Sequence, residues 1–143
     1  MDANTRRMVI FPETEERLVR TARERMPYEA CGVVYGRREG DATIAIGFGL
    51  IRNASSDPER AFTFHPEDWV RAYGEAQKNQ REIVGLFHAH PYRQPKPGAI
   101  DRLGSIPWGT YWIIGLFEDR HSIAVYLRDR DDRWTSLPIL RGE

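Results

Sequence analysis

The sequence predicts a single domain of mixed α/β or α+β class, in which helices cover a mixed β-sheet. Two observations carry this prediction: two helical patterns alternate with short apolar runs in the first part of the chain, and mainly strand-like segments follow them. A chain of 143 residues has the size of one domain and can bury a core without disulfide staples. We therefore expect residues 1–143 to form one domain.

The first helix is expected between two prolines. Met8–Phe11 is a short apolar run typical of a strand, and Pro12 follows it as a residue that starts helices well. Glutamates in the next turn favour a helix N-terminus. The apolar face of this helix consists of residues three or four apart, namely Leu18, Val19, Ala22 and Met26. Pro27 is expected to end the helix.

Two strands and a polar loop are expected next. Cys31–Tyr35 is apolar and partly β-branched, and Thr43–Ile51 reads as a longer strand. The glycines and the aspartate of residues 36–42 predict a turn between these strands. Residues 53–60 are polar and predict a loop, and the alternation in Phe62–Phe64 predicts a short strand.

The second helix is expected to begin at Pro66, again with acidic residues in its first turn. Its predicted buried stripe contains Trp69, Ala72, Tyr73 and Ala76. Ile83–Phe87 is apolar on both faces, which predicts a central, covered strand. A proline-rich loop and a short helical piece at Asp101–Gly104 follow. The remaining predicted strands are Tyr111–Phe117, Ser122–Leu127 and an edge strand at Trp134–Leu140.

The composition excludes several classes of protein. The 21 basic residues balance 21 acidic ones, which argues against a nucleic-acid-coating protein or a polybasic membrane anchor. The N-terminal apolar stretch is too short for a signal peptide, and no apolar run is long enough to span a membrane. The single cysteine, Cys31, allows no intrachain disulfide and is expected to be a small buried hydrophobe. These observations predict a cytoplasmic protein.

The segment Phe87–Pro91, with the sequence FHAHP, carries the strongest chemical signal. Residues two apart in a strand share a face, so His88 and His90 point the same way and can grip one divalent ion. Pro91 is expected to stop the strand and leave the pair at an open rim. A pair of histidines at this spacing is also often incidental, with one ring at the strand end and the other in solvent.

Two carboxylates complete the candidate site. Asp101 follows His90 after ten intervening residues and is the natural third metal ligand, although an aspartate at this position, taken alone, is more often a helix cap. Glu29 lies between the first helix and a core strand, and it is the candidate base for a metal-bound water. Taken alone, Glu29 also suits a surface acid near a turn. His121 lies in a charged turn and is expected to face solvent.

Taken together, these motifs resemble the JAMM (MPN+) metalloprotease family. Glu29-Ala30-Cys31-Gly32 with Gly36 resembles the E-x-C-G-x-x-x-G strand of the family, and the segment from Asn53 to Asp68 resembles its loop and second helix. The FHAHP segment is similar to its metal strand, and the segment Pro97–Asp101 to the P-S-x-x-D motif that closes the site. Four separated motifs therefore stand in the family's order.

The resemblance implies a curved mixed sheet flanked by helices, similar to the cytidine deaminase fold. It implies a zinc-dependent peptidase or isopeptidase in which His88, His90 and Asp101 bind Zn²⁺ and Glu29 moves the proton of the attacking water. The implied substrate is a ubiquitin-like or sulfur-carrier protein with a flexible C-terminal tail. Such a tail is expected to lie along an exposed strand edge near residues 53–64.

One departure from the family pattern leaves alternatives open. Gly98 stands where the family usually has a serine that helps to bind the tetrahedral intermediate, and Ser105 cannot be assumed to replace it. Losing one such donor typically lowers kcat by about 10² to 10³. The first alternative is therefore a catalytically weak or inactive metal-binding module that binds a ubiquitin-like partner. The second is a deaminase-like hydrolase of small molecules, which a single cysteine does not favour.

Overall fold

The computed structural model describes residues 5–98, 109–128 and 133–142. Its helices are α1 (Pro12–Arg23) and α2 (Pro66–Lys78). Its strands are β1 (Arg7–Ile10), β2 (Cys31–Glu39), β3 (Ala42–Ile51), β4 (Glu82–Pro91), β5 (Thr110–Leu116), β6 (His121–Arg128), β7 (Trp134–Leu137) and β8 (Ile139–Arg141). This mixture of strands and helices confirms the predicted class.

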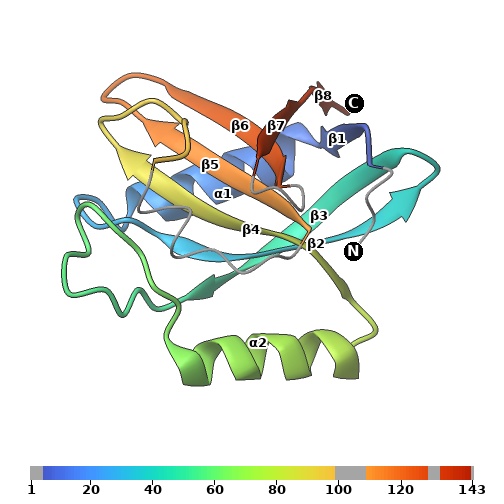
Figure 1. Ribbon diagram of the computed structural model, residues 1–143, viewed down its shortest axis with the longest axis horizontal. Coiled ribbons are helices and arrows are strands. Elements are labelled where there is room, and N and C mark those ends of the chain that lie inside the picture. Colours follow the sequence, from blue (N-terminus) through green and yellow to red (C-terminus); the bar gives the residue numbers. More distant parts are fainter. Residues whose placement is uncertain (1–4, 99–108, 129–132, 143) are drawn as a thin grey trace.

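The strands form one mixed sheet in the order β7-β6-β5-β4-β2-β3-β1-β8. Neighbouring strands run antiparallel except in the pairs β1/β3, β1/β8 and β4/β5. The two ends of this order, β7 and β8, are joined by Pro138 alone. The sheet is therefore strongly curved and nearly closed (Figure 1), as the resemblance implied.

Two hydrophobic clusters lie on opposite faces of the sheet and assign one helix to each face. Side chains of α1 pack with Val34 of β2 and Phe87 of β4, whereas Ala76 of α2 packs with the adjacent residues Val33 and Leu86. Successive residues of a strand point to opposite faces. Helix α1 therefore covers one face, and α2 lies across the other, below the sheet in Figure 1.

Fewer side chains of helix α2 are buried than the sequence predicted. Of the predicted stripe only Ala76 is buried; Trp69 and Ala72 are half-buried, and Tyr73 is 38% exposed. The carboxylate of Asp68 is buried instead, because Arg52 binds it at the end of β3. The prediction was wrong at Tyr73 because the helix contacts the sheet along a narrow line only.

The hairpin of β2 and β3 is tighter than predicted. Strand β2 continues to Glu39, so the predicted turn at 36–42 shrinks to two residues, Gly40 and Asp41. Gly40 has a φ of +60°, which glycine adopts without a steric penalty in a two-residue hairpin turn. The predicted strand Phe62–Phe64 is also wrong, since only an isolated bridge joins Asn53 and Phe64.

Two further boundaries differ because of proline. Helix α1 ends at Arg23 rather than at Pro27, so Met26 lies in the turn after the helix. A residue before proline disfavours the helical conformation, which helps to end the helix early. The predicted edge strand Trp134–Leu140 splits into β7 and β8, because Pro138 has no N–H group to donate to a strand ladder.

Two further predictions concern a membrane-spanning segment and a short helical piece. Within residues 5–98, 109–128 and 133–142, no helix is long and apolar enough to cross a membrane. The predicted helical piece Asp101–Gly104 lies outside the described residues.

Candidate metal centre

Strand β4 presents His88 and His90 on the α2 face of the sheet, as the spacing predicted. Their Nε2 atoms lie 3.1 Å apart, so the two rings converge on one point. The pair is not at an open rim: His88 is 5% exposed and His90 is 2% exposed. Burial removes competing water and strengthens any charge interaction at these nitrogens.

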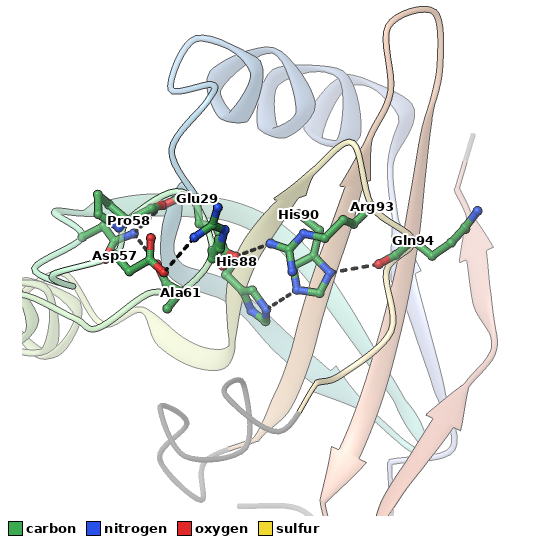
Figure 2. Close-up of polar contacts among 10 residues, drawn as sticks. Glu29, Asp57, Pro58, Ala61, His88, His90, Arg93 and Gln94 are labelled. Atoms are coloured by element: carbon green, nitrogen blue, oxygen red, sulfur yellow. Dashed lines mark hydrogen bonds and ion pairs between the residues drawn. The ribbon is translucent and has the colours of Figure 1, made fainter.

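The tautomer of His90 follows from a backbone contact. Its Nδ1 lies 2.9 Å from the carbonyl oxygen of Gln94, and a carbonyl only accepts, so Nδ1 carries the proton. In the neutral ring, Nε2 then keeps its lone pair and directs it toward His88 (Figure 2). The ring of Phe62 stacks on that of His88 at 4.4 Å between centroids and holds its plane. Metal-binding histidines are usually oriented by contacts of this kind.

Glu29 reaches the same point from the neighbouring strand. Cys31 of β2 faces His88 of β4, and the bond from Ala89 N to Ala30 O extends this pairing by one residue. The same register sets Glu29 level with His90, on the same face. Glu29 is fully buried, and ligand atoms of Glu29, His88 and His90 all lie within 4.8 Å of one another. The interpretation of Glu29 as an exposed surface acid is therefore wrong.

The backbone around Glu29 is held by the side chain of Asn53. Asn53 Nδ2 donates to the carbonyl oxygens of Glu29 and Ala61, each at 3.0 Å. Its Oδ1 accepts from the backbone N–H groups of Ser55 and Thr63 at 3.0 and 3.1 Å. One amide thus ties β2, the end of β3 and the loop before α2 together at the site. Sequence reasoning placed Asn53 in the loop but found no role for it.

Arg93 is a site residue that sequence reasoning missed. Its guanidinium forms an ion pair with the carboxylate of Glu29 (Figure 2). The preceding residue, Tyr92, has a φ of +57°, an uncommon value outside glycine that reverses the chain after Pro91. The bond from Tyr92 N to Leu116 O, 2.6 Å long, holds this reversal. An arginine in a proline-rich loop carries no sequence signal of such a contact.

The structure describes two of the three remaining residues that the sequence analysis singled out. Asp101 lies outside the described residues, so its place as third ligand stays a prediction. Gly98 is described and exposed. Cys31 is 1% exposed, and burial raises the pKa of its thiol to about 12. A thiol with such a pKa is not a nucleophile at neutral pH, which confirms the prediction for Cys31.

The donor set suits a divalent metal ion. Two imidazole nitrogens and a carboxylate oxygen converge in a buried space, and this mixture of ligands is typical of zinc and related ions. The two Nε2 atoms lie 3.1 Å apart, and both would have to be free of protons to bind a metal ion. Among the described residues, these three form the one group of side chains with this capacity.

The comparison with protein families agrees with this geometry. A sequence profile of the prokaryotic homologs of the JAB domain matches residues 12–128, from the start of α1 to the end of β6. The chain belongs to this family. The JAMM/MPN assignment that the motif order predicted is therefore confirmed.

Two curated relatives of this JAB-family chain carry the name desampylase. The one from Pyrococcus furiosus is 29% identical over 106 residues, which are 74% of this chain and 72% of the relative. The one from Haloferax volcanii is 32% identical over 76 residues, which are 53% of each chain, so the match spans about half of that relative.

Solved structures support the same fold. Protein DSY2949 from Desulfitobacterium hafniense superposes with a TM-score of 0.84 at 28% identity, over 95% of this chain and 93% of that one. A protein from Salinibacter ruber superposes with a TM-score of 0.72 at 21% identity, over 95% and 92% of the two chains. The likeness to the second protein concerns the fold alone.

Proposed function

We propose that this JAB-family protein is a zinc-dependent peptidase or isopeptidase. The observation that carries the proposal is the buried convergence of Glu29, His88 and His90 on one face of the sheet. Packing alone does not explain three buried polar side chains, because apolar residues would fill the same space with a smaller desolvation cost. Within this family, this cluster supports a hydrolytic metal centre.

In the proposed mechanism, His88 and His90 would hold the metal ion through their Nε2 atoms, and Asp101 would be the third ligand. When bound, zinc supplies Lewis-acid polarisation of the scissile carbonyl and lowers the pKa of a water molecule. Gln94 keeps the proton on Nδ1 of His90, so that its Nε2 stays a donor of electrons. Phe62 and the buried surroundings of β4 keep bulk water away from the two rings.

Glu29 is the proposed general base and acid. Its carboxylate takes a proton from the attacking water and passes it to the leaving amine of the peptide or isopeptide bond. Its backbone is fixed by Asn53, and its carboxylate is bound by Arg93, so the carboxylate is held in place beside the two histidines. Because bulk water is excluded around the Glu29 carboxylate, the proton passes from the attacking water to the leaving amine without being lost to solvent.

The proposed substrate is the C-terminal tail of a ubiquitin-like or sulfur-carrier protein. The name of the two relatives, desampylase, supports a substrate of the ubiquitin-like kind. The tail would lie along the segment 53–64, whose ends are joined by the bridge between Asn53 and Phe64. We place the reaction in the cytoplasm, where a thiol such as that of Cys31 stays reduced.

The experiment that tests this function is a cleavage assay on a ubiquitin-fold carrier with a short extension after its C-terminal glycines. Mass spectrometry of the zinc-supplemented reaction should show one cut at the end of the carrier. Glu29→Gln should lower the rate by about 10² or more, because general base catalysis is lost. Glu75→Gln, at an exposed position of α2, is the matched control and should cleave as the natural protein does. Equal rates for Glu29→Gln and the natural protein would refute the mechanism.

A second candidate function is a metal-binding module that binds a ubiquitin-like partner without cleaving it. Gly98, which has no side-chain hydroxyl to help an oxyanion, favours it. Gly98→Ser is the useful variant: a large rise in rate would show that one hydrogen-bond donor limited the natural protein. Hydrolysis of a carrier by the natural protein would exclude the inactive module.

A further inference from the structure

A pocket of about 600 Å³ lies between the turn after α1 and the first turns of α2, and Glu29 is one of the residues that line it. Its walls come from the turn after α1, the start of β2, the end of β3 and the first turns of α2. The backbone segment that carries Glu29 is one wall, so the pocket adjoins the candidate catalytic group. The arginines that line this pocket have no role in the proposed reaction.

One side of the pocket holds two arginines fixed on a single carboxylate. Arg52 binds Asp68 through Nε and Nη2, both at 2.9 Å, and Arg71 lies 3.4 Å from the same carboxylate. The side-chain hydrogen bond from Arg52 holds the pKa of Asp68 well below its usual range, so Asp68 stays charged. A guanidinium has five N–H groups, and the contact with Asp68 uses two of those of Arg52. The other N–H groups of Arg52 are not used by this contact, which fixes the guanidinium in the wall of the pocket.

A third arginine, Arg25, also lines the pocket. The Arg25 side chain is exposed, and it makes no hydrogen bond or ion pair with residues 5–98, 109–128 or 133–142. Beside it are two exposed apolar residues, Tyr28 at 53% and Leu50 at 38% exposure. Three cations and two apolar side chains thus surround one hollow.

The charges in this pocket do not cancel. Asp68 balances one of the three arginines, and the carboxylate of Glu29 is balanced by Arg93. Two positive charges therefore remain in the pocket of a protein whose net charge is zero. Arginine pairs of this kind bind carboxylates through charge-assisted, bidentate hydrogen bonds. The apolar rim suits a peptide better than a bare inorganic ion.

We propose that this pocket, formed by Arg25, Arg52 and Arg71, binds an acidic side chain of an extended peptide segment of the substrate protein. The proposal rests on the proposed function for the identity of the partner, because the pocket shares Glu29 with the catalytic centre. A segment bound there would lie a few residues from the bond that is cut, so the pocket selects substrates with an acidic residue near their tail.

Binding is measured on the full chain with a fluorescein-labelled peptide in which two adjacent glutamates are flanked by glycines. A peptide with glutamines in place of the glutamates is the matched ligand. The glutamate peptide should bind in low salt and weaken as salt is added, whereas the glutamine peptide should bind at least about tenfold more weakly, since charge-assisted hydrogen bonds are lost.

Amino-acid substitutions test whether the glutamate peptide binds in this pocket. Arg25→Glu reverses a charge on a side chain without described polar partners and should weaken the glutamate peptide about tenfold or more. Arg71→Gln should weaken it as well. Arg20→Glu makes the same charge change on the exposed face of α1 and should leave affinity within about twofold. Equal losses for Arg20→Glu and Arg25→Glu, or equal binding of the two peptides, would overturn the proposal.

The peptide-binding experiment and the cleavage assay can fail independently, because peptide binding is measured without any substrate being cleaved. If the pocket binds the glutamate peptide but no carrier is cleaved, the proposed hydrolase fails and the peptide site stands. If carriers are cleaved but neither peptide binds, the acidic subsite fails and the hydrolase stands. Where both hold, Arg25→Glu should raise KM for an acidic substrate far more than it lowers kcat.

Discussion

Arg93 forms an ion pair with Glu29 although 64 residues separate them in the chain. Glu29 is fully buried, whereas the Arg93 side chain is 45% exposed. A buried carboxylate is costly without a cation or hydrogen bonds, so the solvent-facing loop after β4 supplies part of the charge balance of the metal centre. The stability of the domain and the geometry of its site are therefore linked at this contact.

Removal of the Arg93 charge should destabilise the protein. Arg93→Gln deprives the buried Glu29 carboxylate of a cation, and we expect a loss of about 1–2 kcal/mol, reduced from a fully buried pair because water screens Arg93. Arg93→Lys should recover much of the loss. Urea denaturation measures both variants, and an unchanged midpoint for Arg93→Gln would mean that the pair contributes no net stability.

Gly32 should tolerate no side chain. A Cβ atom there would lie 2.0 Å from Gly49 O and 2.7 Å from the ring of Phe87. Because backbone cannot give way cheaply, Gly32→Ala should cost about 1–3 kcal/mol or more and shift β2 near the site. Gly47→Ala, at a position in β3 with open space around it, is the control and should change stability by less than about 1 kcal/mol. Thermal denaturation compares the two, and equal melting temperatures would contradict the packing.

Asn53 should be more important than an ordinary loop residue. Asn53→Ala removes four hydrogen bonds of 3.0–3.1 Å and a longer one of 3.5 Å to Pro58 O, which together join Glu29 to the following loop. A hydrogen bond of ordinary length contributes about 1 kcal/mol net. We expect a loss of about 2–4 kcal/mol and faster hydrogen exchange at Ser55 and Thr63. Exchange measured by NMR checks this, and unchanged protection of these two amides would show that the loop does not depend on Asn53.

Glu15 should make the domain sensitive to acid. It binds His121 at 2.9 Å and Arg141 at 3.1 and 3.2 Å, so it links α1, β6 and β8. His121 is exposed, as the sequence predicted, and it is the first residue of β6. Burial alone would raise the pKa of Glu15, but the hydrogen bonds from Arg141 and His121 outweigh it and lower the pKa below 4.5.

A lowered carboxylate pKa contributes stability above its ordinary value, and this contribution is lost as the pH falls through the folded-state value. The natural protein should therefore exceed Glu15→Gln in stability at neutral pH, and the difference should shrink below about pH 4.5. Denaturation midpoints over a pH series measure it. If the stability difference between the natural protein and Glu15→Gln grew as the pH fell, it would contradict a lowered pKa of Glu15.

Local patterns predicted the metal strand well. The apolar run before His88 and His90 and the period of two in a strand sufficed to place both rings on one face. Pro91 ended β4 as expected. These features depend on a few adjacent residues, so they are readable without knowledge of the rest of the fold.

Contacts between segments far apart in the chain could not be predicted from local sequence patterns. The burial of Glu29 depends on the register of β2 against β4, and the role of Arg93 depends on a chain reversal at Tyr92. Likewise, Asp68 is buried by an arginine 16 residues away rather than by the apolar stripe of its own helix. No periodicity within one segment encodes these pairings.

Metal content is the most direct test of the central claim that His88 and His90 bind one divalent ion beside Glu29. The protein is loaded with zinc, passed through a desalting column and analysed by inductively coupled plasma mass spectrometry. We predict about one zinc per chain for the natural protein and for Glu29→Gln, and almost none for His88→Gln or His90→Gln. His65, the residue before α2, is not part of the group formed by Glu29, His88 and His90, so His65→Gln is the control that should keep its metal. A natural protein that retains no divalent metal, or histidine variants that retain it fully, would contradict the account.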